Sequence, residues 1–262
     1  MTMEKIKNLI ETEKKLYKYT GEDRILSSHD LEMAFRQEEK TISVKSGIPT
    51  IDKLITGFEG GELTVISGLT GNGKTLFTQT LTRNFAKQDI NSLWFSYEVR
   101  PDNFLKCFGN KLPLFFLPAR LNGNSIDWIT TRIHEAKLKY EIKAVFIDHL
   151  HYLVDMNRHN MSVEIGAVMR AIKKLALRFN VCFFLIAHTT KIKPETELGL
   201  GDTRDSSFIE QEADNVFYLW RLKKEGNQNQ AVLKIAKNRR NGVFEKKMLL
   251  IKAGNFLEEM TT

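Results

Sequence analysis

The chain has 262 residues, of which 42% are hydrophobic and 27% are charged, and its formal net charge is +7. This composition is that of an ordinary globular protein, and the sequence shows no internal repeat or low-complexity tract. No apolar run approaches the roughly 20 residues of a membrane span, and the polar N-terminus has no signal-peptide pattern. The two cysteines, Cys107 and Cys182, indicate neither a disulfide framework nor a zinc site. We therefore expect a protein without membrane contact that acts in the cytoplasm, or in a host's cytoplasm if its source is viral or a mobile element.

The first 40 residues differ from the remainder in charge and pattern. They carry a net charge of −1, which leaves +8 on residues 41–262, and positive charge there suits a polyanionic partner. Residues 4–19 predict an amphipathic helix, and a second helix is expected from Ser28, as its N-cap, to about residue 38. A segment this small does not fold alone, so its apolar face docks either on this subunit or on a neighbour. We predict a helical linker or docking segment over 1–40 and one large domain over 41–262.

From residue 41 onward, apolar strand-like runs alternate with helical patterns. Strands are expected at 63–67, 92–97, 143–148 and 181–187, with helices at 75–88, 101–109, 125–140 and 162–179. Three later runs joined by polar turns, 215–222, 230–237 and 246–252, read as consecutive antiparallel strands. The pattern predicts an α/β fold in which helices flank a mostly parallel central sheet with an antiparallel C-terminal extension.

A glycine-rich turn between the first of these strands and its helix carries the most specific motif. The run Gly68-Leu69-Thr70-Gly71-Asn72-Gly73-Lys74-Thr75 fits G-x-x-x-x-G-K-[ST], the phosphate-binding loop or P-loop. In this setting backbone N–H groups and the helix N-terminus face phosphate oxygens, Lys74 reaches the β- and γ-phosphates, and the Thr75 hydroxyl ligates Mg²⁺. A glycine-rich turn that matches by accident is the alternative. We predict that ATP and Mg²⁺ bind through Gly68, Thr70, Gly71, Asn72, Gly73, Lys74, Thr75 and Leu76.

Two carboxylates stand where predicted strands end. Asp148 closes the apolar run Val145-Phe146-Ile147, and it would hold Mg²⁺ beside Thr75, directly or through water. Glu98 follows the strand 92–97. Because parallel strands end on the same side of a sheet, Glu98 would stand near the γ-phosphate and deprotonate the attacking water. The alternative for Glu98 is a cap on the helix that begins near Pro101.

A histidine and two basic loops belong to the same rim. His188 ends the fourth strand, where it would hydrogen-bond the γ-phosphate and report hydrolysis to the loop that follows. That loop, 189–207, is long and lacks a pattern, which favours function over packing. A shorter loop, 155–160, follows the third strand. Basic loops beside a nucleotide suit a grip on a nucleic acid, although merely solvated loops are the alternative. The candidate DNA contacts are Arg158, Lys191, Lys193 and Arg204.

Three cations, Lys237, Arg239 and Arg240, end a late strand before a turn. They lie too far along the chain for the first shell of their own P-loop, and could instead supply an arginine finger to an adjacent subunit. A solvated basic turn or a contact with a phosphate backbone competes with this interpretation.

Taken in order, these segments resemble the RecA-like ATPase domain of the DnaB family of hexameric replicative helicases, with its phage primase-helicase and Twinkle relatives. The matching segments are Ser46–Leu54 with Gly57-Phe58, Gly60–Leu63, the P-loop, Ser96-Tyr97-Glu98, Phe146–Leu150, Ile209–Asp214 and Lys237-Asn238-Arg239. The resemblance covers residues 44–257. It implies that Glu98 is the catalytic base and that Lys237 and Arg239 reach the neighbouring subunit's γ-phosphate.

The resemblance has departures. DnaB proteins usually carry glutamine where His188 stands, and His188 is closer to the Twinkle and phage versions. Arg240 stands where one residue is inserted relative to DnaB, so Arg239 is the better finger, with Arg240 in reserve. Only about 40 residues precede the matching region, so the primase recruitment of the family's N-terminal domain is not carried over. A primase or loader partner does not follow from these residues.

The leading hypothesis is an ATP-driven helicase or translocase on single-stranded DNA, assembled as a homo-oligomeric ring, most simply a hexamer, with ATP sites between subunits. The alternative is a RecA-like DNA-dependent ATPase that does not unwind, such as a recombination mediator or remodeller. A small-molecule kinase lacks a lid or acceptor signature here and leaves Lys237 and Arg239 unexplained.

Overall fold

The computed structural model of the chain describes residues 3–21, 24–37, 42–109, 111–154, 161–189, 206–222, 229–242 and 245–260. These separate into two units, Met1–Lys40 and Thr41–Thr262. The first unit contains the helices α1 (Met3–Tyr17) and α2 (Ser28–Gln37). Ser27 caps α2, in place of the predicted Ser28, because the Ser27 hydroxyl oxygen accepts the backbone N–H of Asp30 at 3.1 Å.

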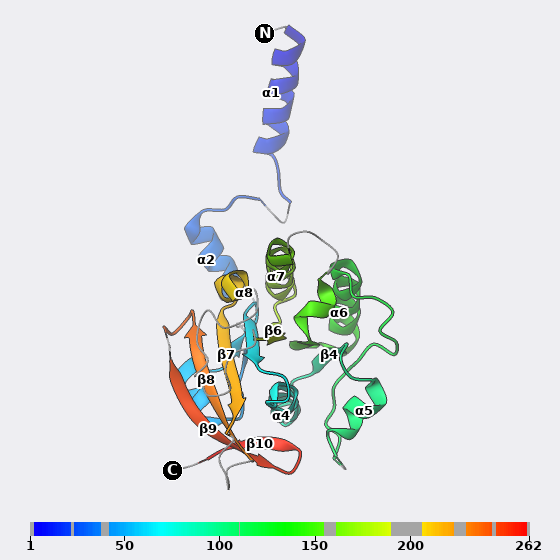
Figure 1. Ribbon diagram of the computed structural model, residues 1–262. Helices are drawn as coiled ribbons and strands as arrows, with labels where there is room; N and C mark the ends of the chain where they lie inside the picture. The colour runs from blue at the N-terminus through cyan, green and yellow to red at the C-terminus, as the bar shows by residue number, and fades with distance from the viewer. Residues whose placement is uncertain are drawn as a thin grey trace. The chain divides into compact units, whose positions relative to one another are not determined.

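An eight-stranded sheet forms the centre of the second unit, in the order β10-β9-β8-β7-β3-β6-β5-β4 (Figure 1). Strands β7, β3, β6, β5 and β4 run parallel, whereas β8, β9 and β10 continue the sheet antiparallel from β7. The predicted α/β fold is therefore confirmed. The strands are β3 (Leu63–Gly68), β4 (Ser92–Ser96), β5 (Ala144–Asp148), β6 (Cys182–His188), β7 (Asn215–Arg221), β8 (Gln230–Asn238), β9 (Lys246–Ala253) and β10 (Phe256–Glu259). A separate pair joins β1 (Ser43–Val44) to β2 (Phe58–Glu59).

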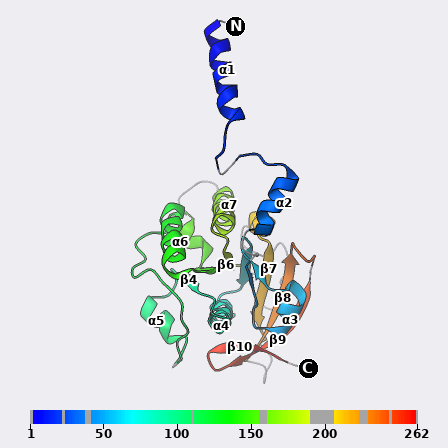
Figure 2. The same ribbon diagram turned by 180° about the vertical axis from the view of Figure 1, so that it is seen from behind.

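Helices cover both faces of the sheet (Figures 1 and 2). One face packs on α3 (Pro49–Ile55), α4 (Lys74–Ala86) and α5 (Pro101–Lys106), and the other on α6 (Ile126–Tyr140), α7 (Met161–Phe179) and α8 (Ser206–Glu212). A short 3-10 helix, η1 (Leu150–Leu153), follows β5. The hydroxyl of Ser125 caps α6 by accepting the N–H of Trp128 at 3.2 Å.

The alternation of side chains along the strands builds the two cores. Val65 packs in the core under α6 and α7, whereas its neighbour Ile66 packs in the core under α4, because successive strand residues point to opposite faces. Aromatic rings fill the α4 side: Phe146 stacks on Trp94 at 4.7 Å and on Phe184 at 4.6 Å between ring centroids. Continuous apolar runs are thus needed in the central strands, which is why these strands are recognisable from sequence.

Several short elements were not predicted, among them α3, α8 and β10. The helix α8 begins at Ser206, inside the loop expected over 189–207, and residues 190–205 of that loop lie outside the described part of the chain. Of the two cysteines, Cys182 is buried and Cys107 is exposed. Among the described residues, no helix has the length and apolarity needed to cross a membrane.

Candidate functional site

The P-loop joins the buried strand β3 to the helix α4 at the C-terminal edge of the parallel strands. Gly71 and Gly73 have φ angles of 78° and 93°, in the region that favours glycine, and Gly73 stands at the N-cap of α4. The loop thereby turns sharply and presents the first N–H groups of α4 toward its concave side. Such an arrangement attracts an anion, because these N–H groups are unpaired and the helix dipole is positive there.

Residue 68 must be glycine for a different reason, because its backbone lies very close to the neighbouring strand β7. A Cβ atom at this position would lie 2.2 Å from the backbone carbonyl oxygen of Leu219 in β7, and the φ angle of Gly68 is 150°. A backbone atom cannot move aside as the end of a flexible side chain can. Any side chain at residue 68 would therefore force β3 and β7 apart at the base of the loop.

Lys74 is buried under the loop, and its ammonium group donates to the carbonyl oxygens of Gly68 at 2.8 Å and Leu69 at 3.1 Å. Burial lowers the pKa of Lys74 to about 8, and the nearby carboxylates of Asp148 and Glu98 oppose that shift. The ammonium thus has partners of negative character on both sides, the loop carbonyls and the two carboxylates. It is placed at the middle of the site.

The Thr75 hydroxyl donates to Asp148 Oδ2 at 2.8 Å, which brings the P-loop and the end of β5 together. Asp148 is fully buried, and its other oxygen, Oδ1, has no hydrogen-bond partner within the described residues. Burial, with a smaller contribution from Glu98, raises the pKa of Asp148 to about 6, against the lowering effect of the Thr75 hydrogen bond. An unpartnered carboxylate oxygen beside a hydroxyl is the all-oxygen environment that Mg²⁺ takes, so these residues fit the predicted metal.

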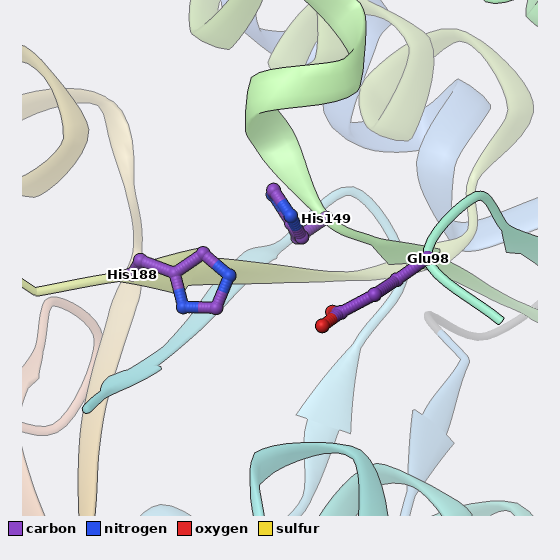
Figure 3. Close-up of side chains that lie close together, drawn as sticks. All are labelled: Glu98, His149 and His188. Carbon is purple, nitrogen blue, oxygen red and sulfur yellow. The ribbon is translucent and has the colours of Figure 1, made fainter. Parts of the chain in front are cut away.

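Glu98, His149 and His188 converge on the same edge of the sheet from β4, β5 and β6 (Figure 3). The strand registers explain this, because Ser96, Asp148 and Ile186 lie side by side across β4, β5 and β6. Each of the three clustered residues follows one of these positions by one or two residues. Nδ1 of His188 lies 3.5 Å from the Thr70 hydroxyl, so β6 also contacts the P-loop. The His149 and His188 rings meet at 4.3 Å between centroids.

Glu98 is exposed and does not cap α5 as the alternative interpretation would have it: the N-cap of that helix is Arg100, without a side-chain hydrogen bond. Burial lowers the pKa of His149 to about 3, with further contributions from His188 and His151, so this ring is neutral near pH 7. A neutral ring and a solvated carboxylate therefore stand side by side.

A cavity of about 270 Å³ is enclosed by these groups. It is lined by Thr70, Gly71, Gly73, Lys74, Thr75, Glu98 and His188, so most of the residues predicted around the triphosphate share one hollow. A smaller cavity of about 90 Å³ adjoins the other side of the loop, and Leu76 lies there. Its wall includes Arg221, Lys252 and Leu257, and Asn72 ties the loop to it by accepting the Arg221 N–H at 2.9 Å.

Lys237 and Arg239 lie toward the opposite end of the sheet from this cavity. The backbone N–H of Arg239 donates to the Asp214 carbonyl, and that of Asp214 donates to the Leu63 carbonyl, so Arg239 is level with the start of β3. The strand from Leu63 to Gly68 rises about 16 Å. The structure therefore does not bring Lys237 or Arg239 into the P-loop cavity of their own chain.

Asp214 connects the basic cluster to the root of β3. Its Oδ2 accepts the Leu63 backbone N–H at 2.8 Å and the Lys173 ammonium at 2.5 Å, and its Oδ1 lies 3.2 Å from the Arg239 guanidinium. Lys237 is anchored nearby, since its ammonium donates to the Ala213 carbonyl at 2.8 Å. The Arg239 side chain remains 51% exposed, while that of Asp214 is 10% exposed.

Arg240 has a different environment, although it is the next residue. Its side chain is 25% exposed, forms ion pairs with Glu59 and Glu62, and donates to the carbonyl oxygens of Ile55 at 2.8 Å and Gly57 at 2.6 Å. Arg240 therefore fastens the turn after β8 to the segment before β3. Arg239 also contacts its own chain, at Asp214 and at the Gln211 carbonyl, but twice as much of its side chain is exposed.

Some predicted residues lie outside the described part of the chain. These are the candidate DNA contacts Arg158, Lys191, Lys193 and Arg204.

Sequence reasoning overlooked His149 as a side chain of the site, and it overlooked Arg221, Lys252 and Leu257. The position of His149 directly after Asp148, at a strand end, was a usable signal. The other three come from β7, β9 and β10, far along the chain from the P-loop and without a motif, so only the folded sheet brings them beside it.

Comparisons with known proteins agree with this geometry. The sequence profile described as DnaB-like helicase C terminal domain matches residues 43–107 and 111–256. The replicative DNA helicase DnaB of Mycoplasma pneumoniae is 27% identical over 259 residues, which cover 83% of this chain and 54% of that protein. A probable replicative DNA helicase of Trieres chinensis is 26% identical over 260 residues, with coverage of 81% and 57%. The chain spans about half the length of these curated relatives.

Two solved structures share the fold. A DnaB-like replicative helicase, described with its interactions with primase, superposes with a TM-score of 0.74 at 18% identity, over 98% of this chain and 72% of that one. The second structure, described as an ATPase domain, superposes with a TM-score of 0.73 at 19% identity, over 89% of this chain and 96% of that one. Because the sequence profile spans most of the residues and the sheet agrees with these structures, the chain belongs to the DnaB-like helicase C-terminal domain family.

Proposed function

We propose that this chain is the motor of a DNA helicase, which hydrolyses ATP at the P-loop and uses the energy to move along single-stranded DNA. The observation that carries the proposal is the hydrogen bond between Thr75 and Asp148 at 2.8 Å, in contact with the cavity that Lys74 and Glu98 line. A phosphate anchor, a cation site and a base in one hollow are the three parts that ATP hydrolysis needs.

The roles of the residues follow from their positions. Lys74 exchanges the loop carbonyls for the β- and γ-phosphates when ATP enters, which is a modest movement for a long side chain. Thr75 and Asp148 hold Mg²⁺, which neutralises charge on the phosphates when it is bound. Glu98 takes a proton from water while the water oxygen bonds to the γ-phosphorus, and the bond from that phosphorus to the bridging oxygen of ADP breaks.

We further propose that the working unit is a homo-oligomeric ring. Glu98 is exposed at the rim, and Lys237 and Arg239 stand about 16 Å along the sheet from their own P-loop. Arg239 has only about half of its side chain covered by its own chain. The distance of Arg239 from its own P-loop and its exposed side chain are both expected of an arginine finger that completes a neighbour's site. A ring would also line up the positive charge of residues 41–262 along one DNA path.

The test combines two assays on one preparation. ATP hydrolysis is measured with and without single-stranded DNA, and strand displacement is measured on forked DNA, with Lys74→Ala as the control for contaminating ATPases. DNA-stimulated hydrolysis together with unwinding supports the proposal. Hydrolysis that DNA stimulates without unwinding would favour a remodeller or recombination mediator. A chain that stays monomeric in the presence of ATP, Mg²⁺ and DNA would contradict the proposed ring.

The DNA grip has its own test. Binding to single-stranded DNA should weaken steeply with salt, because lysines and arginines release counterions from phosphates. Replacing Lys191 and Lys193 together by alanine should flatten that slope and leave ATP affinity unchanged. An unchanged slope would place the DNA path elsewhere on the chain.

A further inference from the structure

Glu98, the proposed base, and His188 lie beside the P-loop together with His149, and a pair of imidazole rings beside a carboxylate is not needed for ATP hydrolysis alone. One ligand atom each of Glu98, His149 and His188 lies within 4.8 Å of the other two (Figure 3). We propose that this cluster is a binding site for a divalent cation of the zinc class, distinct from the magnesium position at Thr75 and Asp148.

The donor atoms separate the two sites. Two imidazole nitrogens and one carboxylate oxygen are the ligands that zinc, cobalt and nickel prefer. Magnesium is a hard cation that takes oxygen ligands and keeps several waters, so the hydroxyl of Thr75 and the buried carboxylate of Asp148 suit it instead. A cation that enters this edge of the sheet is therefore sorted by its preference for nitrogen or oxygen.

The positions of the ligands are set by the strands. The three residues stand at the ends of β4, β5 and β6, which neighbour one another in the sheet, so their backbones cannot drift apart. Ligands about 2.0 to 2.1 Å from a tetrahedral zinc ion stand about 3.4 Å from one another. The ligand atoms of the cluster lie up to 4.8 Å apart, which is farther than this. Rotation of the Glu98 side chain can shorten its distances to the two histidines, because Glu98 is exposed whereas the two rings pack against each other.

Contacts around the rings define how the cation would be held. The Thr70 hydroxyl lies 3.5 Å from Nδ1 of His188, so a hydrogen bond there orients the ring with Nε2 toward the cluster. Nδ1 of His149 accepts the backbone N–H of His151 at 3.3 Å, so in that tautomer Nε2 carries the proton. Binding through Nε2 therefore requires the other tautomer and gives up this long hydrogen bond. Three protein ligands leave the fourth position to water.

Occupation of this cluster would affect hydrolysis, and this second step rests on the proposed function. The Glu98 carboxylate would donate a lone pair to the bound cation, and the cation would offset its negative charge. The carboxylate could then no longer act as a base toward water. We infer that zinc-class cations inhibit the ATPase, and that they do so without displacing magnesium from Thr75 and Asp148.

Cobalt(II) is the probe, because its visible absorption reports nitrogen and oxygen ligands directly. The full chain, free of nucleotide and in a Cys107→Ser background that removes the exposed thiol, is titrated with CoCl₂ and then with ZnCl₂ as competitor. We expect one saturable site, displaced by zinc. His149→Asn, His188→Asn and Glu98→Gln should each weaken cobalt binding by at least about tenfold. His134→Asn, on the exposed face of α6, is the matched control and should bind like the parent chain.

The outcomes separate the site from its consequence. Absence of saturable binding, or ligand variants that bind cobalt as tightly as the parent, would overturn the site. Circular dichroism checks that each variant folds, and the exposed Glu98 variant remains informative if a histidine variant does not. If cobalt binds but zinc leaves ATP hydrolysis unchanged, the inhibition is overturned while the site stands. A chain without ATPase activity would defeat the proposed function, yet the titration would still decide the site.

Discussion

Arg239 and Arg240 form a matched pair of neighbouring arginines whose replacement separates catalysis from stability. Arg239 is 51% exposed and forms an ion pair with Asp214. If it is truncated to alanine, Asp214 keeps Lys173 and the Leu63 N–H, so no buried charge is left alone. The loss of a half-exposed ion pair costs about 0.5 to 1 kcal/mol of unfolding free energy. A finger that stabilises the transition state is worth about 10³-fold or more in hydrolysis rate.

Arg240→Ala should give the opposite result. Its guanidinium satisfies the carboxylates of Glu59 and Glu62 and two carbonyl oxygens, and Glu62 is nearly buried. Removing it takes the guanidinium from both carboxylates and both carbonyl oxygens, while Glu62 keeps the Glu59 N–H and the Asn215 side chain, at a cost of about 2 kcal/mol. Residual hydrolysis per folded molecule should stay within a few fold of the parent chain.

The assays are urea unfolding, binding of a fluorescent ATP analogue and ATP hydrolysis, all on the same preparations. Arg239→Ala should unfold near the parent midpoint, bind the analogue and fail to hydrolyse ATP. Mixing it with Glu98→Gln should return part of the activity, because some interfaces then pair an intact Glu98 with an intact Arg239. A dilution series of parent chain with Glu98→Gln shows beforehand whether turnover needs every site intact.

Two results would refute this reasoning. If Arg239→Ala unfolds at as low a urea concentration as Arg240→Ala, Arg239 stabilises its own chain and does not serve as a finger. Co-assembled mixtures that remain inactive, in a ring shown by the dilution series to tolerate dead sites, would place Arg239 in its own subunit's chemistry.

Three further predictions concern the P-loop edge of the sheet. Glu98→Gln should bind ATP and Mg²⁺ with unchanged affinity yet hydrolyse ATP at least about 10²-fold more slowly, since only the base is lost, and normal single-turnover rates would assign the base elsewhere. The pKa of Asp148 is raised to about 6, and the carboxylate must be ionised to bind metal, so Mg²⁺ affinity should fall about tenfold per pH unit below pH 6. Affinity that holds constant down to about pH 5 would contradict this, because an ordinary aspartate loses its charge only near pH 4. Gly68→Ala should lower the free energy of unfolding by about 3 kcal/mol, because its Cβ would meet the Leu219 carbonyl at 2.2 Å. In the control Gly71→Ala, the added Cβ meets no atom within 4 Å, so the free energy of unfolding should fall only by the roughly 1 kcal/mol of backbone strain. Equal urea midpoints for the two variants would show that the sheet adjusts around residue 68 without this cost.

The parts of the molecule that sequence could predict are those in which one segment carries its own signal. Strands such as Cys182–His188 are buried on both faces and read as apolar runs, and the P-loop is a local motif. The meeting of Glu98, Asp148 and His188 followed from the rule that parallel strands end on one side. Strand β10 is four residues long and reads as a polar tail, although it pairs with β9. The helix α8 is similarly short, and Ile209 is its residue in the buried core.

Asp214 gives the sheet a mechanical property that no single site has. One carboxylate holds the first N–H of β3, the strand that ends in the P-loop, and the arginine proposed to serve the next subunit. If a neighbour's nucleotide drew Arg239 outward, as the proposed finger requires, Asp214 would lose one of its partners and the first N–H of β3 would be held less firmly. Because β3 is stiff along its length, the state of a neighbour's phosphate would be transmitted to the chain's own loop without passing through a flexible segment. In a ring, the same contact in every subunit would make each P-loop sensitive to the nucleotide held at the neighbouring site.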